Sequence, residues 1–157
     1  MEDNTTNILQ EIAKKIRKTS GKIKLISLLD RAKQEYEQNQ ISDCISTCKK
    51  ILKAEPNNAA ALRGLGCAMQ AMGNTKKAIE YYQKALENSK HKEIEYTLLG
   101  TIYYQKDDLE NAIKYYNLAI DANDNYDLAY EGRNQSMLEN HLKIIDLQDS
   151  LIQRKLF

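Results

Sequence analysis

A repeat of 34 residues is the feature that most constrains how this chain folds. When the sequence is aligned with itself at that offset, seven positions are identical between residues 59–92 and 93–126. The identical pairs are Leu65 and Leu99, Gly66 and Gly100, Ala78 and Ala112, Ile79 and Ile113, Tyr81 and Tyr115, Tyr82 and Tyr116, and Ala85 and Ala119. Residues 25–58 keep the same register with weaker identity. A period of this length indicates stacked units that bury their apolar faces against one another.

Each unit contains two apolar stripes at helical spacing with a turn between them. In residues 59–92 the first stripe includes Leu62, Leu65 and Met69, and the second includes Ala78 and Tyr82. The turns are predicted at residues 39–40, 73–74 and 107–108, where Asn, Gly and Asp tolerate a positive φ. Because no segment alternates with period two over a useful length, the sequence predicts an all-α chain without strands.

Small residues mark where the two helices of a unit cross. Gly66 and Ala78 occupy these positions in residues 59–92, and Gly100 and Ala112 occupy them in residues 93–126. A minimal side chain allows two backbones to approach closely, and a larger one would overpack the contact. Tyr rings at the second helices are then expected to wedge between one unit and the next.

These motifs resemble the tetratricopeptide repeat (TPR) family. The run Leu62-x2-Leu65-Gly66-x2-Met69 followed by Ala78-Ile79-Glu80-Tyr81-Tyr82 is similar to its consensus, as is Tyr96-x2-Leu99-Gly100-x2-Tyr103 followed by Ala112-Ile113. The resemblance implies a right-handed α-solenoid of about three helix pairs with capping helices at both ends. The implied divisions are residues 1–24 as an N-terminal amphipathic helix and cap, 25–58, 59–92 and 93–126 as repeat units, and 127–157 as a C-terminal capping helix.

The resemblance also implies a concave groove, lined by the first helix of each unit, that binds a peptide segment or a partner helix. The implied groove residues are Lys33, Tyr36, Ala60, Arg63, Gly64, Cys67, Gln70, Thr97, Thr101, Tyr104, Glu131 and Gln135. A clamp for a peptide carboxylate, as in some co-chaperones of the family, is disfavoured because Cys67 stands where Asn is needed. The alternative that these small residues only keep the helices close stays open.

The two ends of the chain carry apolar side chains that a solvated cap does not need. The N-terminal stripe lies beside a basic face, which favours a cap that folds back on the first unit, with docking of a partner, a second copy or a membrane surface as alternatives. At the C-terminus we expect part of the helix to pack on the last unit and the rest to bury against another chain. The expected oligomer or partner face consists of Ile8, Ile12, Ile16, Leu147, Leu151 and Ile152, with a homodimer through the terminal helices as one outcome.

Composition excludes several classes of function. With 23 Lys+Arg against 22 Asp+Glu the chain has no overall basic field, so nucleic acid is not an expected partner. No apolar run reaches the length of a membrane span, and three Cys with no apolar leader predict a cytoplasmic protein. Charge is nevertheless segregated, since residues 59–92 hold six basic and two acidic side chains while residues 93–126 hold two and seven. This segregation either orients a partner or only solvates two faces.

The sequence therefore favours a non-catalytic protein-interaction module or scaffold. It contains no catalytic motif, and we expect no cofactor and no metal, because Cys44 and Cys48 fall at core positions where Cys acts as a small hydrophobe. One alternative is a small bacterial type III secretion chaperone that holds a translocator segment, since residues 62–67 and 70–73 are similar to the central repeat of that group. A self-assembling scaffold is another alternative.

Overall fold

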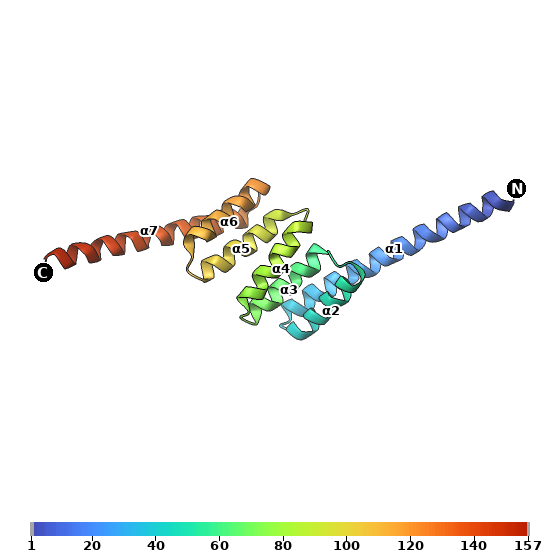
Figure 1. Ribbon diagram of the computed structural model, residues 1–157, viewed down its shortest axis with the longest axis horizontal. Coiled ribbons are helices and arrows are strands. Elements are labelled where there is room, and N and C mark those ends of the chain that lie inside the picture. The colour runs from blue at the N-terminus through green and yellow to red at the C-terminus, as the bar shows by residue number, and fades with distance from the viewer. Residues whose placement is uncertain (1, 157) are drawn as a thin grey trace.

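The structure of the protein is a computed structural model that describes the backbone of residues 2–156 and the side chains of residues 10–152 and 154. This part of the chain forms seven helices and no strand, so the predicted all-α solenoid is confirmed. The helices are α1 (Glu2–Glu37), α2 (Ile41–Ala54), α3 (Ala59–Ala71), α4 (Thr75–Asn88), α5 (Lys92–Gln105), α6 (Leu109–Ala122) and α7 (Asp127–Leu156). Each helix packs on the next one along the chain, and α1 also contacts α3 while α5 contacts α7 (Figure 1).

The same type of turn joins the two helices of each pair, α1–α2, α3–α4 and α5–α6. Asn39, Gly73 and Asp107 have φ values of 60°, 73° and 63°, and they lie one repeat length apart. A residue in this left-handed region ends a helix because it redirects the chain after the last turn. The next helix then begins at an N-cap, where Asn74 accepts a hydrogen bond from the Lys77 amide and Asp108 accepts one from the Asn111 amide.

Tyrosine rings seated on glycines set the distance between neighbouring helices. A Cβ atom on Gly66 would overlap the ring of Tyr82, and one on Gly100 would lie 2.9 Å from the ring of Tyr116. On its other side the Tyr116 ring contacts Gly132 of α7, where a Cβ would again overlap it. The rings of Tyr82 and Tyr116 are buried, so the small residues of the repeat make room for them as well as for the crossing helices.

The expected fold-back of residues 1–24 is wrong. The helix α1 is continuous from Glu2 to Glu37, so the expected boundary at residue 24 lies inside it. Among the described side chains of α1, Leu25 is the first apolar one that packs on the core of the first pair, and the preceding part of the helix extends away from the solenoid (Figure 1). The physical reason is that residues 10–24 offer only Gly21 as a helix breaker, and one glycine costs a helix about 1 kcal/mol.

The helix α7 has two parts with different surroundings. Its beginning packs on α6 and α5, which matches the expected contact with the last unit, and its C-terminal part extends beyond them (Figure 1). None of the described helices is both long enough and apolar enough to cross a membrane.

We expect Gly66→Ala to destabilise the protein, whereas Gly21→Ala should not. The added methyl at residue 66 must displace the Tyr82 ring, at an overpacking cost of about 1–3 kcal/mol, while nothing lies within 4 Å of the position of a Cβ at Gly21. The free energy of unfolding, measured in urea by circular dichroism, checks both variants. Equal stability of the two variants would contradict this account of the glycines.

Candidate functional site

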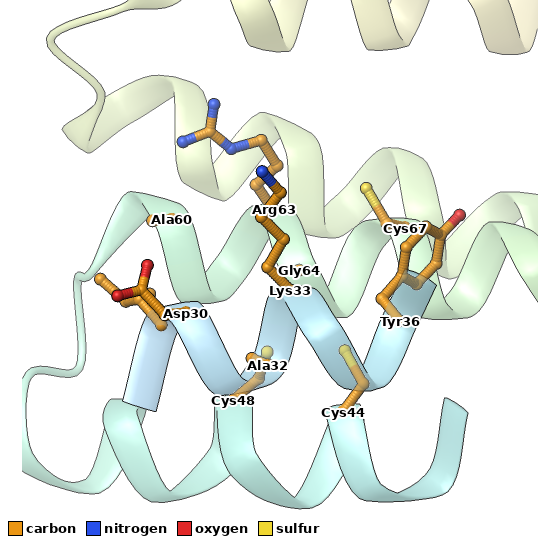
Figure 2. A pocket seen from close by; sticks show the side chains of 11 residues that line it. Asp30, Ala32, Lys33, Tyr36, Cys44, Cys48, Ala60, Arg63, Gly64 and Cys67 are labelled. Atoms are coloured by element: carbon orange, nitrogen blue, oxygen red, sulfur yellow. The ribbon is translucent and has the colours of Figure 1, made fainter. Parts of the chain in front are cut away.

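The first pocket lies between α1, α2 and α3, and we call it the α1–α3 pocket. It has a volume of about 310 Å³. Figure 2 shows Cys44 and Cys48 reaching from α2 toward the floor, with α1 and α3 forming the walls. The side chains that line it are Leu29, Asp30, Ala32, Lys33, Tyr36, Cys44, Cys48, Ala60, Arg63, Gly64 and Cys67.

The floor of the α1–α3 pocket is apolar and uncharged. Cys44 and Cys48 are each 1% exposed, and a Cβ on Gly64 would lie 2.7 Å from the Sγ of Cys48. Burial raises the pKa of Cys48 to about 12 and also raises the pKa of Cys44 and of Cys67. Because thiolates are the reactive form of cysteine, these protonated thiols act as small apolar groups and not as nucleophiles.

Charged groups stand at the rim of this pocket, and one of them is engaged by the next unit. Asp30 and Lys33 come from α1, and Arg63 comes from α3. The Nε of Arg63 lies 3.6 Å from an Oε of Glu95, whose side chain is fully buried and has no hydrogen-bond donor among the described residues. The Nε of Arg63 therefore faces a buried carboxylate of α5, while the same side chain stands at the rim of the pocket.

A second pocket lies between α5 and α7, and we call it the α5–α7 pocket. It has a volume of about 500 Å³, and both polar and apolar side chains line it. Gln135 donates to the hydroxyl of Tyr104 over 3.0 Å, and that hydroxyl donates to Glu139 over 2.6 Å, which raises the pKa of Tyr104. The lining side chains are Ile94, Thr97, Leu98, Thr101, Tyr104, Gln105, Tyr116, Tyr126, Leu128, Glu131, Gly132 and Gln135.

Hydrogen bonds join the two pockets across α3 and α5. The hydroxyl of Tyr82 lies 3.3 Å from the Sγ of Cys67, which lines the first pocket, and donates over 2.9 Å to Gln70. The amide of Gln70 donates over 2.9 Å to Gln105, which lines the second pocket. These contacts link the linings of the two pockets from α1 to α7, and we call the lining residues of both pockets together with Gln70 the groove.

The residues expected in the groove from sequence fall on this surface. Eleven of the twelve line the two pockets, and Gln70 joins them. The cysteines of α2, which the sequence predicts as core residues, also form the floor of the first pocket. Tyr116 and Tyr126 were not expected here, and no sequence signal shows that a ring between two units also reaches the groove.

The side chains expected to form an oligomer or partner face are exposed wherever the structure describes them. Ile12 and Ile16 lie on the extended part of α1, and Leu147, Leu151 and Ile152 lie on the extended part of α7. The side chain of Ile8 lies outside the described residues. These residues do not lie together with the groove, so the chain offers two separate kinds of surface.

The fold and the groove define a helical-repeat protein with a continuous lining of side chains along one face. Models of the tetratricopeptide repeat match residues 59–91 and residues 96–126. These two segments are therefore tetratricopeptide repeats. Residues 25–58 are a third repeat unit by prediction only. In this segment α1 and α2 pack as a pair and are joined by the same left-handed turn.

Solved structures share this fold at low sequence identity. The first TPR of Spaghetti (RPAP3) bound to an HSP90 peptide has a TM-score of 0.65 and 16% identity, covering 74% of this chain and 93% of that one. The Sgt2 TPR domain from Aspergillus fumigatus has a TM-score of 0.67 and 20% identity, covering 75% and 80%. A mutant O-GlcNAc transferase from Thermobaculum terrenum has a TM-score of 0.66 and 20% identity, covering 72% of this chain and 22% of that one. No curated protein matches the chain.

We expect Arg63 and Glu95 to be energetically coupled. Replacing Arg63 with Met leaves the buried Glu95 carboxylate without its counter-charge, so the loss of stability should be larger in the native background than in a Glu95→Gln background. A double-mutant cycle on the free energy of unfolding should give a coupling of about 0.5–3 kcal/mol. Additive effects of the two substitutions would show that the contact carries no energy.

Proposed function

We propose that the groove binds a peptide segment of another protein, with a small apolar side chain anchored in the α1–α3 pocket. The observation that carries this proposal is the continuity of the groove, in which Gln70 and Gln105 link two pockets along one face. An extended peptide needs such a surface, with a pocket for its anchor and polar groups for its backbone. The protein acts in this role as a non-catalytic interaction module.

The chemistry of the α1–α3 pocket defines the anchor. Protonated thiols, Ala32 and Ala60 give this pocket of about 310 Å³ an apolar floor, which suits an aliphatic side chain because a carboxylate buried there would lose its hydration. The similar TPR of RPAP3 was solved with the HSP90 peptide SRMEEVD, which supports peptide binding by this fold. The contact between the Arg63 Nε and Glu95 reduces the positive charge that this rim offers to an acidic peptide, which supports an aliphatic anchor.

A substitution that fills the α1–α3 pocket with a large side chain tests the proposal. Peptides selected from a random 12-residue library should bind the protein with micromolar or lower dissociation constants in fluorescence anisotropy, and replacing their aliphatic anchor with Asp should abolish binding. Ala60→Trp fills the pocket from its rim and should weaken binding at least tenfold. Ala54→Trp places the same bulk on an exposed site outside both pockets and should leave binding unchanged.

Two results would overturn this function. One is the failure of the library to yield any peptide that competes for the groove. The other is equal binding by the two Trp variants, which would place the peptide elsewhere on the chain. Circular dichroism of both variants establishes that the solenoid is folded in each measurement.

A secretion chaperone that holds a translocator segment is a more specific form of the same function. Gly64 and Cys67, which belong to the motif that carries this resemblance, line the α1–α3 pocket. Under this form, co-expression with a translocator encoded by a neighbouring gene should raise the soluble yield of that translocator, and Ala60→Trp should remove the gain. An unchanged yield would leave the general module without the chaperone role.

A further inference from the structure

The helix α7 turns its polar side toward the solenoid and its apolar side toward solvent. Glu139 accepts a hydrogen bond from Tyr104, Lys143 forms an ion pair with Asp107, and the fully buried Ser136 donates to its own helix. In residues 137–152 of α7, eight large apolar side chains are between 39% and 64% exposed: Met137, Leu138, Leu142, Ile144, Ile145, Leu147, Leu151 and Ile152. A helix that only capped the last unit would have the reverse arrangement.

The extended part of α1 carries a second exposed apolar seam. Ile12, Ile16, Ile23 and Ile26 are 47–63% exposed and, with Thr19, follow the alternating four- and three-residue spacing of a coiled-coil seam. On α7, Leu138, Leu142, Ile145 and Ile152 follow the same spacing, with Asp149 at one seam position. Both segments therefore have the pattern of helices that pack along a partner helix.

Charge indicates which helices pair. Residues 10–26 of α1 contain six basic side chains and one acidic side chain, so two copies of this segment repel each other. Residues 137–152 of α7 contain three acidic side chains and one Lys, so they attract the α1 segment. The two segments also match in length, since 16 or 17 helical residues span about 25 Å.

The two extended segments cannot meet within one chain, because they project from opposite ends of the solenoid (Figure 1). We propose that a second copy of this chain covers them, with residues 10–26 of one copy packed along residues 137–152 of the next. The two surfaces of this contact are different, so a linear array of any length keeps one unpaired α1 segment at one end and one unpaired α7 segment at the other. A contact of this kind adds copies head to tail and does not stop at a dimer unless the rotation closes a ring.

Light scattering after size exclusion tests the contact on the full chain. The wild type should have an average mass that rises with concentration past twice the chain mass of 18.1 kDa. An α1 variant (Ile16→Gln/Ile23→Gln) and an α7 variant (Leu142→Gln/Ile145→Gln) should each run as a monomer. Gln keeps the charge and the helix, and all four sites are exposed, so the fold is unaffected. Met72→Gln changes an equally exposed apolar side chain outside both segments and should assemble like the wild type.

A mixture of the two variants gives the deciding measurement. The α1 variant keeps an intact α7 and the α7 variant keeps an intact α1, so an equimolar mixture should form a 1:1 dimer and nothing larger. If the α1 variant alone dimerises, α7 pairs with α7 and the proposal is wrong. If the α7 variant alone dimerises, α1 pairs with α1, which equally overturns it. A wild type that stays monomeric at several hundred micromolar would refute assembly by a second copy.

Discussion

The seating of a tyrosine ring on a glycine is the contact on which the rest of the structure depends. Tyr82 rests on Gly66, and Tyr116 fills the space between Gly100 and Gly132, so one ring fixes three helices. The same two residues extend their hydroxyl groups toward the groove, where Tyr82 contacts Gln70 and Tyr116 lies 3.2 Å from Thr101. The stacking of the units and the lining of the groove therefore cannot change independently.

The floor of the α1–α3 pocket is uncharged, although charged side chains stand at its rim. Arg63 is drawn to the buried Glu95 of the neighbouring unit, and the thiols beneath it stay protonated because they are buried. Basic residues are concentrated in residues 59–92 and acidic residues in residues 93–126. One pair of these opposite charges, Arg63 and Glu95, lies at the contact between the two units inside the protein. Under the two proposals, the groove selects a peptide by shape and hydrogen bonds, and the extended helices supply the long-range attraction between copies.

Much of the fold follows from the sequence because the repeat carries local information. Periodic apolar residues fix the helices, and the turns at Asn39, Gly73 and Asp107 follow from residues that tolerate a positive φ. The direction of α1 beyond the first pair differs from the prediction, because an apolar stripe favours cover by the same chain but no strong helix breaker precedes Leu25 to turn the helix back. The groove residues came from the family pattern, but the double role of Cys48 as core and pocket floor depends on its distance to Gly64, which spacing alone does not give.

The continuity of α1 has a mechanical consequence. One helix forms both the extended segment and a wall of the α1–α3 pocket, where it supplies Leu29, Lys33 and Tyr36. Because no turn separates these two parts, a force or torque applied to the extended segment passes along an unbroken hydrogen-bonded rod to the wall of the pocket. A displacement of the extended segment therefore tilts the part of the same helix that forms a wall of the α1–α3 pocket.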